Sequence, residues 1–220
     1  MVYLFTGTPG SGKSLHMSKI IYHALRNGKK FVITNFFIDW EKYPELHREN
    51  YLYIGNDEMS PDKLIQVASE YWSTHTASSY RDAESRILLF IDEAQILFNA
   101  RSWQQNYQKK WTWFFSVHRH YGFQIYLSTQ MDTNLDKQVR GIVEYNCVHR
   151  KISNIGLWGK LISFFAFGEL FYSVLRWYPM KEKVDGSFFR YRKKYGGLYD
   201  THALFSEDNE TASIISITKK

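Results

Sequence analysis

The chain has 220 residues, of which 44% are hydrophobic and 18% aromatic, so an intrinsically disordered protein is excluded and one sizeable folded core is expected. The single cysteine, Cys147, cannot form an intrachain disulfide or supply a structural zinc site by itself, which excludes a disulfide scaffold and indicates a reducing compartment. With 28 Lys and Arg against 22 Asp and Glu, the net charge is +6. Nucleic acid and anionic membranes are both possible partners on charge alone.

The first half of the chain alternates strand patterns with helix patterns. Apolar runs predict strands at residues 2–6, 31–34, 51–54 and 87–91. Helical spacing predicts a helix at residues 14–26 that ends at Gly28, and a second at residues 61–71 that is opened by Ser60 and Pro61. The polar residues 73–85 show no period and predict a surface loop.

The second half continues the alternation and then changes character. Helices are expected at residues 103–121 and 135–140, and strands at residues 123–128 and 143–150. This order predicts an α/β fold with a mainly parallel sheet flanked by helices. After residue 150 the segments become aromatic and basic, and residues 184–187 predict the turn of a β-hairpin between residues 170–178 and 187–191.

Residues 155–178 are the best candidate for contact with a membrane. Their charge-free part, residues 161–168, is far shorter than the ~20 residues that a spanning helix needs. We therefore expect no transmembrane helix here. The segment is either a core helix or strand, or an aromatic and basic patch that lies at a membrane surface.

A phosphate-binding loop is the strongest motif in the chain. Residues 7–14 read GTPGSGKS, a full match to G-x-x-x-x-G-K-[ST] between a predicted strand and a predicted helix. The glycines let backbone N–H groups point at phosphate oxygens, Lys13 bridges the β- and γ-phosphates, and the hydroxyl of Ser14 binds Mg²⁺. The residues expected to contact the nucleotide are Gly7, Thr8, Pro9, Gly10, Ser11, Gly12, Lys13, Ser14 and Leu15.

Two adjacent carboxylates follow the apolar strand at residues 87–91. Asp92 at the strand end is expected to hold the metal with Ser14, and Glu93 is expected to polarise the water that attacks the γ-phosphate. This pair favours hydrolysis over small-molecule phosphorylation. The alternative for Glu93 is a solvated N-cap of the next helix.

Two more polar residues end strands at the same predicted edge of the sheet. Gln130 follows the strand at residues 123–128 and is a candidate to sense or orient the attacking water, with a simple strand-end residue as the alternative. Asn35 follows the strand at residues 31–34 and is a candidate to position a group there, although Asn at this place is also common in turns.

Three arginines are candidates for a finger that acts on the nucleotide of a neighbouring subunit: Arg101, Arg119 and Arg140. The alternative for each is an ordinary salt bridge. A finger supplied in this way would make hydrolysis depend on assembly.

Several of these motifs together are similar to a known family. The resemblance rests on GTPGSGKS, Thr34-Asn35, IDEAQ, FNARSW at 98–103, HRHYGFQIYLSTQ at 118–130, LDKQVR at 135–140 and LYDT at 198–201. With these motifs the chain resembles the N-terminal cytoplasmic domain of filamentous-phage assembly ATPases, the gene I proteins and their zonula occludens toxin-like relatives. The resemblance covers most of the chain and implies the P-loop NTPase fold.

The resemblance implies an ATPase motor for inovirus assembly and extrusion through the host inner membrane. It implies ATP and Mg²⁺ as cofactors, a homo-oligomeric ring, and partners among phage coat and envelope assembly proteins. By the same resemblance Lys13, Ser14, Asp92 and Glu93 carry the ATPase roles, and Arg119 lies in the family's Arg-containing stretch. In the family a membrane helix follows this domain. Since this chain lacks it, we expect a soluble domain at the cytoplasmic face of the bacterial inner membrane.

The charge is distributed unevenly over the predicted units, which are a P-loop ATPase core at residues 1–150, an appendage packed on it at 151–205 and a polar tail at 206–220. Residues 150–194 hold 10 basic and 3 acidic side chains, whereas residues 1–149 hold 16 and 15. The appendage is therefore the candidate for docking to an anionic membrane surface or to coat protein, and nucleic acid is the less favoured partner. Two other functions stay open: a nucleotide-gated binding module for envelope or secretion partners, and a DNA-translocating ATPase.

Overall fold

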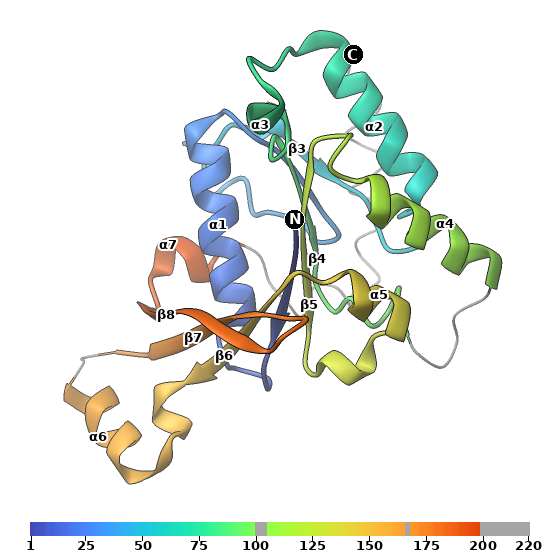
Figure 1. The fold of residues 1–220 in the computed structure, drawn as a ribbon. Helices are drawn as coiled ribbons and strands as arrows, with labels where there is room; N and C mark the ends of the chain where they lie inside the picture. Colours follow the sequence, from blue (N-terminus) through green and yellow to red (C-terminus); the bar gives the residue numbers. More distant parts are fainter. Residues whose placement is uncertain (100–104, 166–167, 199–220) are drawn as a thin grey trace.

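One β-sheet forms the centre of the molecule in the computed structural model, which describes residues 1–99, 105–165 and 168–198 (Figure 1). Its strands are β1 (Val2–Thr6), β2 (Phe31–Thr34), β3 (Tyr51–Tyr53), β4 (Ile87–Ile91), β5 (Phe123–Thr129), β6 (Tyr145–Lys151), β7 (Leu170–Trp177) and β8 (Glu182–Arg190). They lie in the order β3-β2-β4-β5-β1-β6-β7-β8. All neighbours from β3 to β6 are parallel, and β7 and β8 are added antiparallel. The prediction of a mainly parallel sheet is confirmed.

Helices cover both faces of this sheet (Figure 1). One face carries α1 (Lys13–Asn27) and α7 (Lys193–Gly196), and the other carries α2 (Pro61–Thr74), α4 (Gln105–Val117) and α5 (Lys137–Ile142). The remaining helices are α3 (Tyr80–Ala83) and α6 (Gly156–Phe165), with short 3₁₀ turns at Arg48–Asn50, Asp132–Asn134 and Ile152–Asn154. The expected layering of helices on both faces is therefore present.

The central strand β4 shows how the sequence specifies these layers. All five of its residues are buried. Leu88 and Phe90 pack into the cluster on the α1 side, while Ile87, Leu89 and Ile91 pack into the cluster under α2 and α4. An uninterrupted apolar run is typical of a parallel strand that is covered on both faces, because its side chains alternate between two cores.

Helix ends lie where the capping residues predict them. The hydroxyl of Ser60 accepts a hydrogen bond from the N–H of Lys63, and Pro61 occupies the first turn of α2. Gly28 follows α1 with a φ of 65°, and its N–H donates to the carbonyl of Leu25. A left-handed residue after a helix strongly favours glycine.

The polar segment at residues 73–85 is not a loop throughout, so this prediction is wrong in part. Helix α2 extends to Thr74, and α3 adds a turn at Tyr80–Ala83. The hydroxyl of Ser79 accepts from the N–H of Asp82, and Asp82 pairs with Arg86 at 2.6 Å. These short-range interactions stabilise a helical turn that has no apolar period.

The predicted hairpin exists, but its predicted turn is wrong. β7 and β8 are joined by residues 178–181, where Lys181 takes a φ of 57°, and residues 184–187 lie inside β8. Gly186 allows close packing within the hairpin, because a Cβ at this position would lie 2.5 Å from the hydroxyl oxygen of Tyr172 on β7. The Asp-Gly pair thus reflects close packing across the hairpin, which the sequence pattern alone cannot distinguish from a turn.

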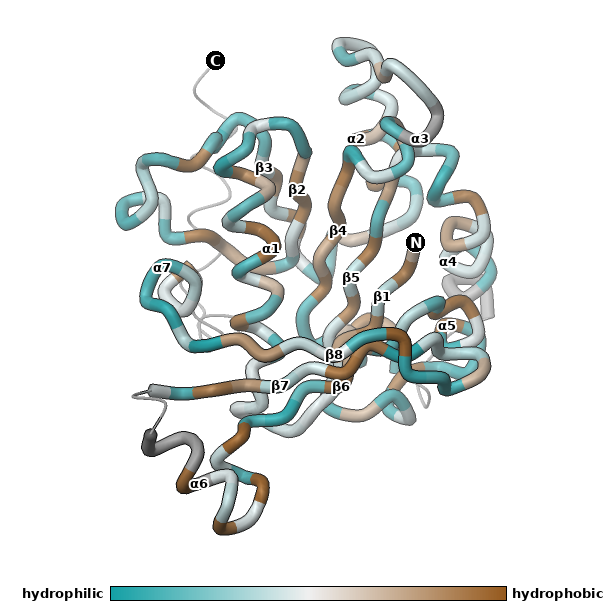
Figure 2. The backbone as a smooth tube through the Cα atoms, turned by 60° about the vertical axis from the view of Figure 1, so that its left-hand side comes forward, coloured by the Kyte–Doolittle hydropathy of each residue, from teal (hydrophilic) through white to brown (hydrophobic). Residues whose placement is uncertain are grey.

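Residues 155–178 split into two different structures. β7 is paired within the sheet, whereas α6 projects from the body of the molecule (Figures 1 and 2). Leu157 and Trp158 on α6 are 84% and 78% exposed, so core packing is the wrong interpretation for this part of the segment. Among the described residues, no helix combines the length and the hydropathy needed to cross a membrane.

Candidate nucleotide site

The phosphate loop joins β1 to α1 with a backbone that depends on glycine. Gly7, Gly10 and Gly12 have φ values of 147°, 71° and 96°. A Cβ on Gly7 would lie 2.6 Å from the carbonyl oxygen of His149, and one on Gly12 would lie 2.7 Å from the ring of Phe171. The loop therefore needs glycine for its torsion angles and, at two of the three positions, for close contact with β6 and β7.

The other loop residues differ in their exposure. Thr8, Pro9 and Gly10 are exposed at the tip of the loop, where the backbone is accessible to a ligand. Ser11 is buried, its N–H donates to the carbonyl of Thr8 at 3.1 Å, and its hydroxyl has no hydrogen-bond partner within the described structure. Leu15 packs against the core on the α1 side, so it anchors the start of α1 and does not line the phosphate site.

Lys13 is folded back onto the loop. Its Nζ donates to the carbonyl of Gly7 at 2.8 Å and to that of Thr8 at 3.4 Å. Burial lowers the pKa of this ammonium, and the negative charges of Asp92 and Glu93 oppose that shift. The carbonyl contacts compensate a buried charge in a place where phosphate oxygens would do so better.

Ser14 and Asp92 face each other at the end of the sheet that lies beside the phosphate loop, which we call the phosphate edge. The hydroxyl of Ser14 donates to Oδ2 of Asp92 at 3.4 Å. A hydroxyl and a carboxylate at this separation are oxygen donors of the kind that Mg²⁺ prefers. These two side chains could therefore hold the ion.

Asn35 fixes the position of Asp92. Its Nδ2 donates to the Asp92 carbonyl at 2.9 Å and its Oδ1 accepts from the Asp92 N–H at 2.8 Å. The same amide also donates to Oδ1 of Asn56. Since Asn35 is 1% exposed, it connects the ends of β2 and β4 instead of facing a ligand or serving as a turn residue.

Glu93 lies in an unusual backbone conformation. Its φ is 48°, a left-handed value that costs a non-glycine residue about 1–3 kcal/mol. Its N–H donates to Oδ1 of Asp92, and its carboxylate accepts from Nε2 of Gln95. Residues 92–97 form turns and not a helix, so the alternative of a helix cap does not apply there.

Strand β5 lies between β1 and β4, which places its end between the loop and the two carboxylates. The N–H of Gly7 donates to the carbonyl of Gln130 at 3.2 Å, and the N–H of Ala94 donates to that of Ser128 at 2.7 Å. The side chain of Gln130 is exposed, whereas Ser128 is fully buried. The structure thus brings Gln130 beside the loop, and its role as a water sensor stays a prediction.

Arg119 lies far from this site. It precedes β5 at the opposite edge of the sheet, and a strand of seven residues spans roughly 20 Å. Its guanidinium pairs with Glu144 at 2.6 Å and with Glu84 at 3.7 Å. It cannot reach the phosphate loop of its own chain.

Of the other two arginines, the structure describes Arg140 and leaves Arg101 outside the described residues. Arg140 lies in the last turn of α5. It lies beside Tyr178, whose pKa is raised to about 12 by burial and by its hydrogen bond to Asp132, while the guanidinium of Arg140 lowers it.

Three residues of the site were not singled out from the sequence: Asn56, Gln95 and Ser128. Gln95 belongs to the quoted IDEAQ motif, whose spacing of two residues from Glu93 was a usable signal. Ser128 directly precedes the Thr129-Gln130 pair and has a buried hydroxyl with no hydrogen-bond partner in the described part of the chain. Asn56 had no sequence signal, because its position depends on the loop after β3.

Comparison with known proteins gives one family and a set of similar folds. The family described as Zonular occludens toxin (Zot) matches residues 1–204. No curated protein matches the chain in sequence.

Among solved structures, the N-terminal domain of zonular occludens toxin from Neisseria meningitidis is similar with a TM-score of 0.52 and 21% identity, covering 90% of this chain and 98% of that one. The genome packaging NTPase B204 from Sulfolobus turreted icosahedral virus 2, in complex with AMP, gives 0.51 and 16%, covering 87% and 96%. EssC (ATPases 2 and 3) from Geobacillus thermodenitrificans gives 0.50 and 14%, covering 98% and 44%. At these identities the similarity concerns the fold, which is that of the P-loop NTPases.

Proposed function

The chain belongs to the zonular occludens toxin (Zot) family, and from this premise we propose that it hydrolyses ATP with Mg²⁺ to drive assembly and extrusion of filamentous phage through the host inner membrane. The observation that carries the hydrolysis is the position of Ser14 beside Asp92, with Glu93 next to it, at the mouth of a glycine-dependent phosphate loop. Mg²⁺ would supply charge neutralisation of the phosphates there.

Binding begins with the loop. The backbone N–H groups of the loop and of the first turn of α1 hold the phosphate oxygens, and Lys13 exchanges its two carbonyl contacts for the β- and γ-phosphates. Because the ammonium is buried and its pKa is lowered by that burial, the gain from an anionic partner is larger than at a solvated lysine. Asn35 keeps Asp92 in place during this exchange.

Glu93 acts on the water. Its carboxylate accepts a proton from the attacking water while the oxygen of the water bonds to the γ-phosphorus, and the bond to the β,γ-bridging oxygen breaks. Gln95 holds the carboxylate from one side. Gln130 directly follows β5, its carbonyl accepts from the N–H of Gly7, and its side chain orients the same water from the other side of the loop.

A ring of subunits would complete the site. Arg119 is paired with Glu144 away from the phosphate edge of its own chain, so we propose that an arginine of the neighbouring subunit neutralises the charge that develops in the transition state. ATP turnover per chain then rises with protein concentration. One of Arg101→Ala, Arg119→Ala and Arg140→Ala abolishes this rise without loss of nucleotide binding.

The basic, aromatic part of the chain is the proposed docking region. Helix α6 presents exposed apolar side chains, and residues 150–194 hold 10 basic and 3 acidic side chains. These features support contact with coat protein, envelope assembly proteins or the anionic inner face of the membrane. Liposome flotation with and without anionic lipid tests the last of these.

The central experiment compares ATP turnover of Lys13→Ala and Glu93→Gln with wild type. We expect a loss of about 10²-fold or more in turnover for Glu93→Gln, the size of a general-base contribution, while ATP binding is retained. Lys13→Ala should lose binding as well. Lys29→Ala and Glu58→Gln, both at exposed positions, are the matched controls. Wild-type turnover in Lys13→Ala would refute the proposal.

Two other functions separate from the motor by simple outcomes. In a nucleotide-gated binding module, Glu93→Gln would change partner binding little, whereas in the motor it traps ATP and the partner complex. A DNA translocase is suggested by the fold similarity to a genome packaging NTPase. It would show single-strand affinity that falls steeply with salt.

A further inference from the structure

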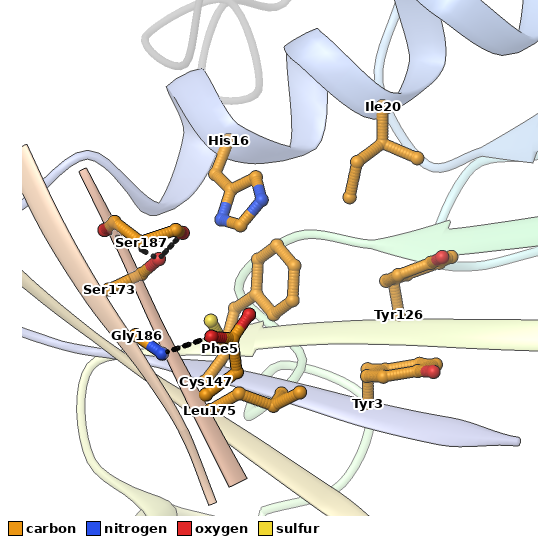
Figure 3. A pocket seen from close by; sticks show the side chains of 11 residues that line it. Tyr3, Phe5, His16, Ile20, Tyr126, Cys147, Ser173, Leu175, Gly186 and Ser187 are labelled. Carbon is orange, nitrogen blue, oxygen red and sulfur yellow. Dashed lines mark hydrogen bonds between the residues drawn. The ribbon is translucent and has the colours of Figure 1, made fainter. Parts of the chain in front are cut away.

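A cluster of three side chains, of types that can bind metals, lies between α1 and β6. His16 comes from the first turns of α1, and Cys147 and His149 come from β6. Their ligand atoms all lie within 4.8 Å of one another. Figure 3 shows the ring of His16 and the sulfur of Cys147 bordering the same cavity from opposite sides.

The distances are close to those of a tetrahedral zinc site. Nδ1 of His16 lies 2.8 Å from Nε2 of His149, and Sγ of Cys147 lies 3.8 Å from the same Nε2. With Zn–N near 2.0 Å and Zn–S near 2.3 Å, tetrahedral ligands are separated by about 3.3 to 3.6 Å. These two separations differ from the tetrahedral values by about half an ångström or less, and the remaining pair, His16 and Cys147, lies within 4.8 Å.

The two imidazoles are poorly satisfied as a simple core pair. His149 is 1% exposed, and its Nδ1 has no hydrogen-bond partner in the described part of the chain. Burial of a polar atom without a partner is unfavourable. When a metal takes Nε2, Nδ1 carries the ring proton and needs an acceptor. Burial lowers the pKa of His149, and the nearby backbone of Thr6 and Cys147, which acts to raise it, can supply that acceptor.

A fourth position is available on the open side of the cluster. The adjoining cavity has a volume of about 270 Å³, and its wall includes Ser173, Asp185 and Ser187 from the β7–β8 hairpin. Ser173 and Ser187 are hydrogen-bonded to each other across that wall (Figure 3). A water molecule or the carboxylate of Asp185 could complete the coordination from there.

We propose that His16, Cys147 and His149 form a zinc site, separate from the Mg²⁺ position at Ser14 and Asp92. Two imidazoles and one thiolate favour Zn²⁺ over Mg²⁺, which takes oxygen ligands. Binding releases the thiol proton, and the proton shared between the two rings moves to a nitrogen that does not bind the metal.

The site would tie the phosphate loop to the sheet. His16 follows Ser14 by two residues, and the carbonyl of His149 packs against Gly7. A metal between these two histidines links both ends of the loop through β6. Zinc should therefore raise the melting temperature of the protein whether or not ATP is turned over.

Cobalt substitution tests the site selectively, because Cys147 is the single cysteine in the chain. The purified chain of 220 residues is freed of metal and titrated with Co²⁺ and with Zn²⁺. We expect one equivalent to bind with a thiolate-to-cobalt charge-transfer band, Zn²⁺ to displace it, and the melting temperature to rise. Cys147→Ser and His149→Gln should lose the band and the thermal shift.

Two variants serve as controls. His23→Gln changes the exposed histidine of α1, which contacts Tyr195 instead, and Asp92→Asn changes the Mg²⁺ position; both should keep the band. Circular dichroism checks that each variant is folded. Absence of the band in folded wild-type protein, or equal zinc binding by folded Cys147→Ser and His149→Gln, would overturn the proposal.

Discussion

Replacement of Gly12 by alanine tests how far the β7–β8 hairpin supports the phosphate loop. Gly12 has a φ of 96°, and a Cβ there would lie 2.7 Å from Cδ1 of Phe171 on β7. Gly10 offers a comparison, since its φ is 71° and no atom lies within 4 Å of the added Cβ. Gly10→Ala therefore introduces backbone strain alone, and Gly12→Ala introduces strain and overlap.

The magnitudes follow from these two contributions. A left-handed conformation costs an L-residue about 1–2 kcal/mol, and we expect this destabilisation for Gly10→Ala. Overpacking adds about 1–3 kcal/mol, so Gly12→Ala should lose about 2–5 kcal/mol of unfolding free energy. For a chain of this size each kcal/mol lowers the melting temperature by about 2–4 °C.

Urea denaturation measures both variants, and a double-mutant cycle with Phe171→Leu isolates the overlap. Phe171→Leu should cost less stability in the Gly12→Ala background than in wild type, with a coupling of about 0.5–3 kcal/mol. Equal destabilisation by Gly10→Ala and Gly12→Ala, together with zero coupling to Phe171, would refute the claim that β7 holds the loop.

Three further outcomes are expected from buried polar groups. Asn35→Ala removes the side chain that bonds to the N–H and carbonyl of Asp92. In urea denaturation it should lower the free energy of unfolding by about 2–5 kcal/mol, whereas Asn56→Ala should lower it by less than about 1.5 kcal/mol. Similar losses in both variants would argue against the bridging role of Asn35. Burial lowers the pKa of His118 from 6.5 to about 4, so on acidification this histidine binds a proton in the unfolded chain before it does so in the folded one. About 2 kcal/mol of unfolding free energy should therefore be lost between pH 7 and pH 5 through this group. If His118→Gln left the dependence of stability on pH unchanged, this prediction would be wrong. Burial raises the pKa of Cys147 to about 12. At pH 8 the metal-free protein should therefore react with thiol reagents on the order of 10³-fold more slowly than free cysteine. A reaction rate near that of free cysteine would show that the thiol is accessible and contradict the prediction.

The parallel part of the fold could be predicted because its signals are local. The apolar run at β4, the Gly28 stop and the Ser60-Pro61 start each act over a few residues, and all are confirmed. The turn between β7 and β8 could not be predicted from the sequence, because Gly186 is needed for close packing against Tyr172 on the other strand and not for a turn. The exposure of α6 was equally hidden, because an apolar helix that projects has the same composition as one that is buried.

The site divides in the same way. The positions of Lys13, Ser14 and Asp92 at the phosphate edge follow from motif spacing and strand order. Asn35 was found as a candidate, but its role as a bridge to Asp92 depends on β2 and β4 being neighbours. The distance of Arg119 from the loop could be recognised only once the direction of β5 was known. In the HRHYGFQIYLSTQ motif Arg119 and Gln130 are close in sequence, but the strand between them places them at opposite ends.

The two outer strands of the sheet affect how copies of this chain meet. β3 has only three residues, and β8, with nine, carries Glu182, Lys183, Asp185 and Arg190. An open strand edge can pair with another chain and lead to aggregation, and short or charged edge strands oppose such pairing. At high protein concentration, the short β3 and the charged β8 therefore oppose extension of the sheet into a second copy.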